Sequence, residues 1–411
     1  MKLLRLTSAY PAYLREFYRR RRSLRRQPYA AQLKELNDDA FGWADFWVHA
    51  LAPLGYSVWD ITANAKPMQM AWAEEHGVRP SAERWLVDIA SAQVLNFAPE
   101  VLFMDDYANF SASWIRDVRA ACPSIRLVVG WCGAPYDDDS VFGAYDVVLS
   151  CIPELVREFR DKGHKTFHLN HAFDPRIAAR LPVVERDIDL SFVGQLSVGR
   201  EAHHKRLEIL SRLSKEVRLQ IHSPQTSRLF DLSDGPIPYL VKDLIRIPWY
   251  HAYWTLRRAG VPVDGIPYFR KALKWTKRPR MNPIPRSPIA GMQPGLFGMD
   301  MFRLLRQSKL TFNSHIDVSR ESASNMRLFE ATGSGACLVT DWKQNLGELF
   351  EPDTEVVTYR SAAECVEKVK WLLEHSRQSA QIADAGAKRT LEQHTFAHRA
   401  PELDKIIRQH L

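Results

Sequence analysis

The residues best suited to chemistry lie in the segment Ser324-Asn-Met-Arg-Leu-Phe-Glu330-Ala-Thr-Gly-Ser-Gly335. Ser324 or Asn325 can cap the start of a helix, which leaves backbone N–H groups free to face an anion. Arg327 adds a forked donor for a diphosphate. Glu330 follows on the same helix face and has the two acceptor oxygens that suit a ribose diol. This spacing predicts a site for a nucleoside diphosphate.

A glycine-containing loop provides a second candidate phosphate contact. The segment from Phe192 reads as a strand, a loop with Gly194 and Gly199, and then a helix. Glycines let the backbone approach a phosphate, and Arg200 and Lys205 can neutralise charge on a departing pyrophosphate.

Both segments also have a purely structural interpretation. Arg327 and Glu330 can form an ordinary helix-surface pair, with the glycines that follow only ending the helix. Arg200 and Lys205 can be solvated cations on the first turn of a helix. The residues themselves leave both interpretations open.

The elements that must position these residues alternate between short apolar runs and amphipathic segments. In the first half, strands are expected at 3–6, 57–61, 101–104, 127–130, 146–149 and 166–169. Helical patterns include 45–54, 111–121 and 153–162. This alternation predicts a parallel sheet covered by helices.

The pattern restarts after the turn signal His171-Ala-Phe-Asp-Pro175 and Pro182. Strands are expected at 189–194, 218–222, 310–313, 337–340 and 355–359. Helices are expected at 202–216 and 325–333, followed by a long helical tail from Ala362. The second half is therefore also α/β.

We expect two Rossmann-like domains, because 411 residues exceed one ordinary domain. The predicted boundaries are 1–182 and 183–385, with an insertion at about 224–295 in the second domain. A C-terminal helix, 386–411, can cross back to the first domain. Open parallel sheets bind ligands beyond the carboxyl ends of their strands, so a cleft between the domains is the expected site.

The positive charge is concentrated in two segments. The formal net charge is +8. Residues 236–290 hold eleven Lys and Arg against two Asp, and residues 15–26 hold seven Arg against one Glu. The remainder is mildly acidic, which disfavours a protein that coats nucleic acid uniformly. Each basic segment needs a local explanation.

Cysteine usage and hydropathy bear on location. The five cysteines form no C-x-x-C pair and no zinc-site spacing, which indicates a reducing cytoplasm. No apolar stretch approaches the roughly 20 residues that span a bilayer. We expect a cytoplasmic protein that is soluble or held peripherally on the inner membrane face.

Several motifs, taken together, resemble a known family. The motifs are Asn325, Arg327, Phe329-Glu330-Ala331, Gly335, Glu348-Leu-Phe350, Tyr359, Ala383-x-Ala-Gly386 and His394-Thr395, with Phe192-Val-Gly194, Tyr10-Pro-x-Tyr-Leu, Phe41-Gly-Trp-x-Asp-Phe-Trp47 and Leu54-Gly-Tyr56 earlier in the chain. They resemble bacterial GT-B glycosyltransferases of the spore-maturation (CgeB-like) family within the glycosyl transferases group 1 superfamily.

The resemblance implies a fold, an activity and residue roles. The fold would be GT-B, with two Rossmann-like domains that face a cleft. Glu330 would hold the nucleotide ribose, and Arg200 and Lys205 would contact the donor phosphates. GT-B enzymes position the diphosphate with helix dipoles and cations, so neither a metal nor a cofactor is expected beside the nucleotide sugar.

One position departs from the GT-B pattern. Many GT-B transferases carry a second glutamate eight positions before the one matched by Glu330, but this chain has Ser322 there, with Glu321 out of register. The sequence therefore leaves open which residue contacts the donor sugar. The pair Asp105-Asp106 is not the D-x-D of metal-dependent transferases, because its spacing differs.

Three aspartates are candidates for a general base. Asp137 follows a predicted strand in Trp131-Cys-Gly-Ala-Pro-Tyr-Asp137, and Asp45 and Asp105 lie in equivalent loops. An inverting transfer needs such a base to take the proton of the acceptor hydroxyl, whereas a retaining transfer does not. Each aspartate can instead be a helix cap or turn residue. His49 is expected to be structural.

The basic segment 236–290 interleaves its cations with eight aromatic residues, Tyr239, Trp249, Tyr250, Tyr253, Trp254, Tyr268, Phe269 and Trp275. This composition favours docking on an anionic membrane surface beside a lipid-linked acceptor. The alternatives are stacking on single-stranded RNA and a proline-rich lid packed on its own domain.

The sequence predicts a hexosyltransferase-like enzyme of cell-surface polysaccharide biosynthesis. It would move a sugar from a nucleotide-diphosphate donor to a glycan, lipid-linked glycan or protein hydroxyl, and nucleic acid is not an expected partner. One alternative is a nucleotide-sugar epimerase of the same fold. Another is a non-catalytic scaffold associated with membrane or RNA, since fold alone does not define activity.

Overall fold

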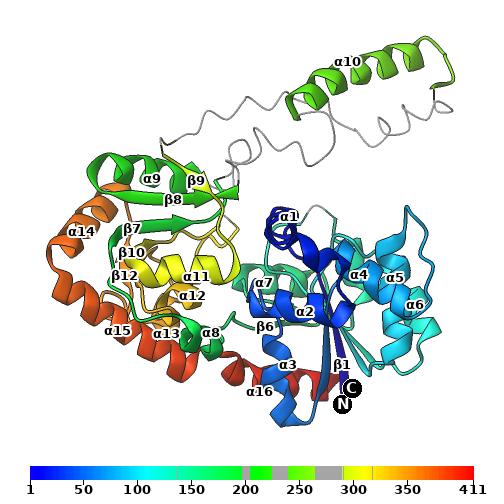
Figure 1. Cartoon of the computed structure of the whole chain (residues 1–411), viewed down its shortest axis with the longest axis horizontal. Coiled ribbons are helices and arrows are strands. Elements are labelled where there is room, and N and C mark those ends of the chain that lie inside the picture. The colour runs from blue at the N-terminus through cyan, green and yellow to red at the C-terminus, as the bar shows by residue number, and fades with distance from the viewer. Residues whose placement is uncertain (137, 197–203, 225–238, 264–288, 290, 317) are drawn as a thin grey trace. The chain divides into compact units, whose positions relative to one another are not determined.

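The computed structural model describes residues 1–136, 138–196, 204–224, 239–263, 289, 291–316 and 318–411, and of these the side chains of 204–205 and 239–247 are left out. The described chain forms two six-stranded parallel sheets flanked by helices (Figure 1). The predicted α/β fold class is confirmed.

The first sheet has the strand order β2-β1-β3-β4-β5-β6. Its strands are β1 (Lys2–Thr7), β2 (Ser57–Thr62), β3 (Val101–Met104), β4 (Leu127–Trp131), β5 (Val147–Ser150) and β6 (Thr166–His168). Strands β3, β4 and β5 are buried along their whole length, which explains their unbroken apolar sequences. The order reverses between β1 and β3, which defines a topological switch point.

The second sheet has the order β12-β11-β10-β7-β8-β9. Its strands are β7 (Ile188–Val193), β8 (Leu219–Ser223), β9 (Gln293–Pro294), β10 (Ser308–Phe312), β11 (Cys337–Asp341) and β12 (Val357–Tyr359). All the predicted strands exist within a few residues of their expected bounds, and of the strands in the described part of the chain only β9 was not foreseen. The switch point of this sheet lies between β7 and β10.

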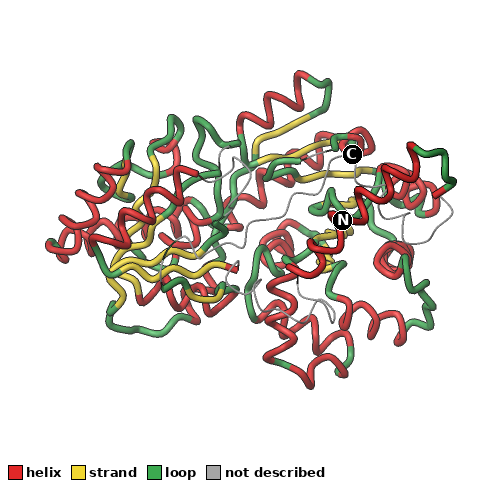
Figure 2. Tube along the Cα trace, turned by 90° about the horizontal axis from the view of Figure 1, so that it is seen from above, coloured by secondary structure: helices red, strands yellow, loops and turns green. Residues whose placement is uncertain are grey.

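The helices fill the connections between strands, as Figure 2 shows. Those of the first half are α1 (Pro11–Arg20), α2 (Tyr29–Asp38), α3 (Phe46–Leu51), α4 (Lys66–Glu75), α5 (Trp85–Phe97), α6 (Ala112–Ala121), α7 (Pro153–Asp161) and α8 (Pro175–Arg180). Those of the second half include α9 (His204–Glu216), α10 (Tyr239–Arg258), α11 (Gly298–Gln307), α12 (Arg327–Gly333) and α13 (Leu346–Leu349).

The long helical tail predicted from Ala362 consists of three helices. They are α14 (Ala362–Glu374), α15 (Ser376–Gln393) and α16 (Phe396–His410). Breaks occur at His375 and at the pair His394-Thr395. Helix α16 packs on α3, where the Phe396 ring contacts Trp47 edge-on with 5.0 Å between ring centroids. The chain therefore returns to the first sheet at its end.

The chain divides into two compact units. The first unit comprises Met1–Phe192, Glu216–Leu219 and Phe297–Leu411, so it contains the first sheet and strands β10 to β12. The second comprises Val193–Lys215 and Gln220–Leu296. The predicted domain boundaries at 182 and 385 stay a prediction.

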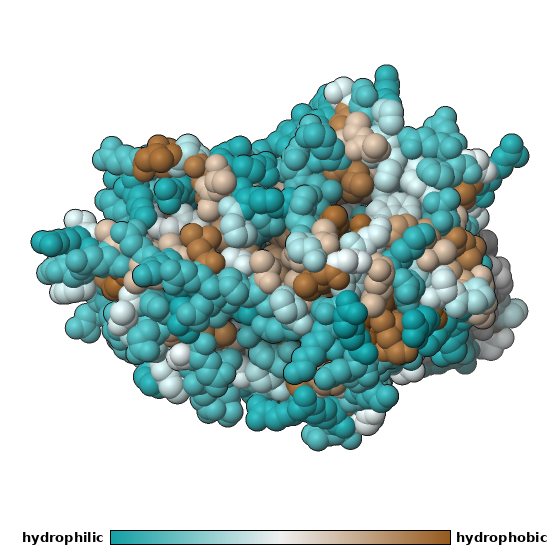
Figure 3. All heavy atoms as spheres, turned by 90° about the horizontal axis from the view of Figure 1, so that it is seen from below, coloured by the Kyte–Doolittle hydropathy of each residue, from teal (hydrophilic) through white to brown (hydrophobic). Residues whose placement is uncertain are grey.

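No helix among the described residues is both long and apolar enough to cross a membrane. The face seen in Figure 3 is mainly hydrophilic, with hydrophobic residues scattered between polar ones. Scattered apolar groups are ordinary on a protein surface.

Candidate active site

The segment before α12 is tied to the carboxyl edge of the second sheet by two asparagines. Asn313 directly follows β10, and the Asn325 Nδ2 group donates to Asn313 Oδ1 at 2.8 Å. The Asn313 amide in turn donates to Thr340 Oγ1 on β11 at 2.9 Å. These contacts hold the start of α12 at the edge where parallel sheets bind ligands.

The predicted cap of this helix is wrong. Helix α12 begins at Arg327, after Met326, and no side chain caps it. Asn325 is engaged with Asn313, and the Ser324 hydroxyl pairs with the Ser319 hydroxyl at 2.6 Å. Because the helix has only seven residues, its dipole makes a weak case for an anion site, and Asn325 acts as a positioning residue.

Arg327 and Glu330 form a largely buried ion pair. The distance from Arg327 Nη1 to Glu330 Oε2 is 3.2 Å, and the two side chains are 16% and 11% exposed. Burial raises the pKa of Glu330, and the charge of Arg327 offsets part of that shift. Because both side chains are largely buried, they do not form the solvated surface pair of the structural interpretation. A carboxylate held away from water binds hydroxyl donors more strongly.

A histidine that the sequence argument missed lies at the same edge. His315 Nδ1 and Asp341 Oδ1 are 2.7 Å apart, and the His315 backbone N–H also donates to Asp341. Burial raises the pKa of Asp341, but the contacts from His315 and then Lys343 outweigh burial and hold the pKa well below its usual range. The sequence signal was a histidine two residues past the end of the strand predicted at 310–313.

A carboxylate from the first half contacts the segment around Ser322, the position at which many GT-B transferases carry a second glutamate. Glu154, at the start of α7, accepts hydrogen bonds from the backbone N–H groups of Glu321 and Ser322, at 2.9 and 3.1 Å. Burial raises the pKa of Glu154, but these bonds bring the net pKa below its ordinary value. The side chain of Ser322 itself has no carboxylate.

Asp105 belongs to a buried network at the switch point of the first sheet. Arg5, on β1, donates to Asp60 at 2.9 Å and to Asp105 at 3.0 Å. The Thr7 hydroxyl also donates to Asp105, at 2.9 Å. Burial raises the pKa of Asp105 to about 6, against the opposing charge of Arg5. A carboxyl group with that pKa can exchange a proton near neutral pH.

The other two candidate bases have different settings. Asp45 precedes α3 and accepts hydrogen bonds from Arg176 at 2.7 Å and His49 at 3.1 Å, so it serves an ion-pair cluster. Asp137 lies outside the described residues. Of the two aspartates in the described chain, Asp105 follows β3 and so lies at the topological switch point.

Tyr10 connects the two halves electrostatically. It lies between β1 and α1, and its pKa is raised first by removal from water and then by the charges of Glu330 and Asp105. Because 57% of Tyr10 is exposed, water screens these charges and their effect on the phenol is small. The charge of Arg327 opposes it.

The predicted phosphate loop is described only in part. Gly194 follows β7, and its N–H donates to the His222 carbonyl at 3.1 Å within the second unit. Arg200 lies outside the described residues, and Lys205 lies in α9 without a described side chain. In the part of the chain that is described, no group of three His, Cys, Asp or Glu side chains is arranged to hold a metal ion.

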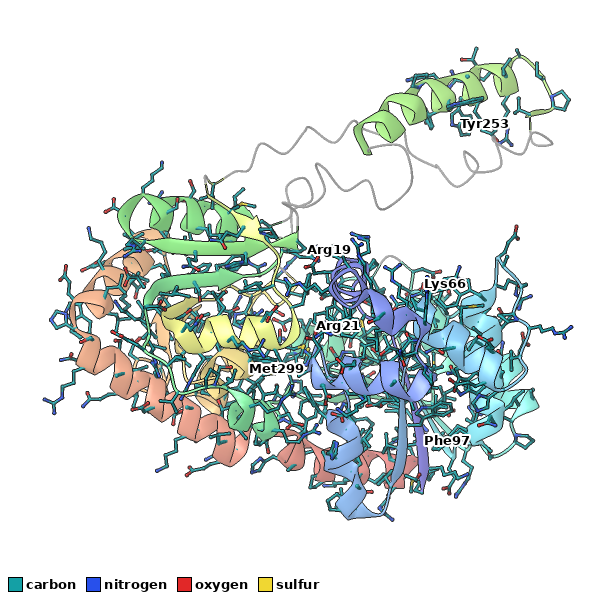
Figure 4. All side chains as sticks on the ribbon, viewed as in Figure 1. Arg19, Arg21, Lys66, Phe97, Tyr253 and Met299 are labelled. Carbon is teal, nitrogen blue, oxygen red and sulfur yellow. The ribbon has the colours of Figure 1, made fainter. Side chains whose placement is uncertain are left out.

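The two basic segments differ in their surroundings. In the segment 15–26, Arg19 pairs with Glu16 at 2.7 Å, and Arg20 also pairs with Asp300; Figure 4 labels Arg19 and Arg21 near the end of α1. In the segment 236–290, α10 buries Tyr253, which accepts a hydrogen bond from Arg257 at 2.6 Å. The residues 264–288 and 290 lie outside the described chain.

Residues 269–405 match the family model described as "Glycosyl transferase-like". This match covers less than half of the chain and includes β10, β11, α12 and the Arg327–Glu330 pair. A comparison with curated protein sequences found no match.

Three solved structures with the same fold are distant in sequence. HepE of Anabaena, in complex with UDP and glucose, is 10% identical with a TM-score of 0.53, and the alignment covers 100% of both chains. Sucrose-phosphate synthase from Thermosynechococcus elongatus is 10% identical with a TM-score of 0.50, over 100% of this chain and 98% of that one. AviGT4, a glycosyltransferase involved in avilamycin A biosynthesis, is 13% identical with a TM-score of 0.51, over 100% and 97%.

The chain therefore has the GT-B fold of these glycosyltransferases. The predicted resemblance to the GT-B group is confirmed. The narrower resemblance to the CgeB-like family stays a prediction.

Proposed function

We propose that this protein transfers a sugar from a nucleotide diphosphate to an acceptor hydroxyl. The observation that carries the proposal is the buried Arg327–Glu330 pair, which lies in the glycosyl-transferase-like segment of a GT-B fold. Glu330 accepts hydrogen bonds from the ribose diol, and Arg327 holds that carboxylate in place. Arg200, Lys205 and the backbone at Gly194 would contact the diphosphate without a metal ion or a cofactor.

For an inverting transfer, Asp105 is the base that the geometry favours. The acceptor hydroxyl gives its proton to the Asp105 carboxylate as its oxygen bonds to the anomeric carbon of the donor sugar. The bond from that carbon to the diphosphate breaks, and the nucleoside diphosphate leaves with the electron pair. Arg5 keeps Asp105 oriented, and the carboxyl pKa of about 6 leaves the carboxylate ionised at neutral pH.

The donor is best sought first among uridine nucleotides. HepE, which has the same fold, was solved with UDP and glucose and with UDP-glucose, at TM-scores of 0.53 and 0.52. At 10% and 11% identity, these complexes guide the choice of ligand only.

A thermal-shift panel of UDP, GDP, dTDP and ADP tests nucleotide binding. One nucleotide should raise the melting temperature clearly, since a ligand at about 100 times its Kd adds about 2.7 kcal/mol. Glu330→Ala should abolish that shift, and Glu367→Ala, at an exposed glutamate of α14, should leave it intact. No shift with any of the four would contradict the proposal and favour a non-catalytic scaffold.

Product analysis then separates a transferase from an epimerase. The protein is incubated with the sugar donors of the stabilising nucleotide, with and without a membrane extract. A transferase releases the nucleoside diphosphate and labels an acceptor, which we propose to be a glycan, a lipid-linked glycan or a protein of the cell-surface polysaccharide machinery. An epimerase converts the donor sugar without any acceptor.

We propose that the segment 236–290 holds this cytoplasmic enzyme on an anionic membrane surface. The support is its charge and aromatic content, together with Trp249 on α10, which is 41% exposed. Flotation with liposomes that contain anionic lipid should recover the full chain and lose the variant that lacks 236–290. Equal recovery of the two would contradict membrane docking, and binding of single-stranded RNA by the full chain alone would favour the RNA alternative.

A further inference from the structure

Tyr10 presents an open aromatic face at the candidate active site. The residue is 57% exposed, although aromatic rings of this size are usually at least half buried. The ring of Phe41 contacts it edge-on, with 5.7 Å between centroids and an interplanar angle of 66°. Phe41 is itself stacked on Tyr13 at 3.9 Å. One side of Tyr10 is thus supported, and much of the ring stays open.

The loop that carries Tyr10 is held at every residue. The Asn64 side chain accepts from the Ala9 N–H at 3.0 Å and donates to the Ala9 carbonyl at 2.7 Å. The Ser8 hydroxyl donates to Asp106, and the Tyr10 carbonyl accepts the first bond of α1, from Leu14 at 3.1 Å. A rigid loop loses little conformational entropy when a ligand binds to it, so the exposed ring is pre-organised.

The place of this loop in the fold also points to a ligand. It follows β1 at the switch point between β1 and β3, where open parallel sheets bind their ligands. The last residue of β1, Thr7, donates to Asp105, the candidate base. The charge of Glu330 raises the pKa of Tyr10 and that of Arg327 lowers it, which is consistent with this place in the fold.

We propose that the Tyr10 ring stacks against the sugar ring of the acceptor, so that the acceptor is a carbohydrate and not the side chain of a protein. The inference rests on the proposed transferase function. Tyrosine offers a flat, rigid and amphipathic surface. The apolar C–H face of a pyranose lies on that surface while its hydroxyl groups meet the polar groups of Asp105 and Ser8. Tyr10 therefore sets which hydroxyl the base can reach.

The surroundings of Tyr10 favour a sugar over the other acceptors. A bare lipid tail needs a continuous apolar surface, whereas Ser8, Asp105 and Asp106 make the edge of this loop polar. A serine or threonine side chain is too small to cover an aromatic face. A pyranose has both an apolar face and a rim of hydroxyl groups, which matches an aromatic ring beside carboxylates.

Saturation-transfer NMR with a panel of simple glycosides tests this inference. The probes are the methyl pyranosides of glucose, galactose, mannose and N-acetylglucosamine, measured in the presence of UDP, with a serine-containing peptide as the competing acceptor class. At least one glycoside should bind to the wild-type protein. Tyr10→Ala should weaken its binding about tenfold, equal to about 1.4 kcal/mol, and Tyr10→Phe should keep it within about threefold because the ring remains.

Trp371→Ala is a matched control, because Trp371, on α14, is another aromatic residue with a similar exposed fraction of 47%. Trp371→Ala should bind the glycoside as the wild type does. Three results would each overturn the inference. They are equal glycoside binding by Tyr10→Ala and the wild type, binding of the peptide alone, and no binding of any glycoside.

Failure of this inference is distinguishable from failure of the proposed function. The nucleotide-induced thermal shift is measured on the same Tyr10→Ala sample and should be unchanged, because Tyr10 contacts the acceptor and not the nucleotide. A wild-type protein that no nucleotide stabilises contradicts the transferase itself. A normal nucleotide shift without a Tyr10 effect on glycoside binding contradicts only the stacking.

Discussion

The two halves of the molecule build carboxylate sites in different ways. In the first half, Arg5 projects from the middle of a central strand and binds two carboxylates, Asp60 and Asp105. In the second half, Arg327 and Glu330 pair one turn apart on a seven-residue helix. The network embedded in the sheet fixes the position and raises the pKa of Asp105. In the proposed function, the pair on the short helix offers the Glu330 carboxylate to the nucleotide.

The comparison predicts that Arg5 matters most for stability. Arg5→Met removes the counter-charge of two buried carboxylates, and breaking a buried network of this kind costs about 3–5 kcal/mol of unfolding free energy. Denaturant titration measures the loss. Arg22→Met, at an exposed arginine, should stay within about 0.5 kcal/mol of the wild type. A loss of unfolding free energy below about 1 kcal/mol for Arg5→Met would show that the Arg5 network does not stabilise the fold substantially.

The second prediction concerns the pH dependence that Asp105 confers. If its carboxylate accepts the proton, kcat/KM should fall about tenfold per pH unit below its pKa of about 6. The raised pKa means that the folded state holds this proton more tightly than the unfolded state. Its stabilisation is therefore complete below pH 3.8, the ordinary value, and is lost as the pH rises to about 6.

Asp105→Asn should remove both effects and lower the rate about 100-fold. Asp384→Asn, at an exposed aspartate of α15, serves as the control and should keep the wild-type profile. An unchanged pH–rate profile in Asp105→Asn would exclude this residue as the base and favour a retaining transfer.

The third prediction separates ligand binding from stability in the second half. Glu330→Gln removes a charged acceptor for the ribose diol and should weaken nucleotide binding about 10-fold to 100-fold in calorimetry. Because burial raises the pKa of Glu330, the neutral amide should leave the melting temperature equal or slightly higher. Unchanged nucleotide affinity would mean that the pair is structural.

The smallest expected effect is at Glu154. Glu154→Gln keeps one acceptor oxygen for the N–H groups of Glu321 and Ser322, so the loss of unfolding free energy should be about 0.5–1.5 kcal/mol. The pKa of Glu154 is lowered in the folded state, so its contribution is present above its ordinary value of 4.5 and is lost as the pH falls. If Glu154→Gln lost the same unfolding free energy at pH 3 and at pH 7, the ionised Glu154 carboxylate would not be the stabilising group.

The fold was predictable because its signals are local. Buried parallel strands such as β3 and β5 are short apolar runs, and amphipathic helices separate them. The Arg327–Glu330 pair was also predictable, since its members are three residues apart. The helix cap at Asn325 was predicted wrongly because a tertiary partner, Asn313, takes the side chain that a local pattern assigned to the helix.

The network of Arg5 was not predictable from one sequence. Arg5 lies inside the apolar run Leu3–Leu6, and its partners Asp60 and Asp105 are 55 and 100 residues away. Only the parallel register of β1 with β2 and β3 brings them together. His315 and Asp341 meet in the same way, beyond the ends of neighbouring strands, although they are 26 positions apart in the chain.

The return of α16 to α3 has a consequence for synthesis on the ribosome. Trp47 belongs to the first α/β half, whereas its partner Phe396 is made about 350 residues later. Chains begin to fold from the N-terminus while translation continues. The first half must therefore wait until residue 396 and the rest of α16 have been made before its α3 surface is covered, and a chain cut before residue 396 should expose that surface and aggregate.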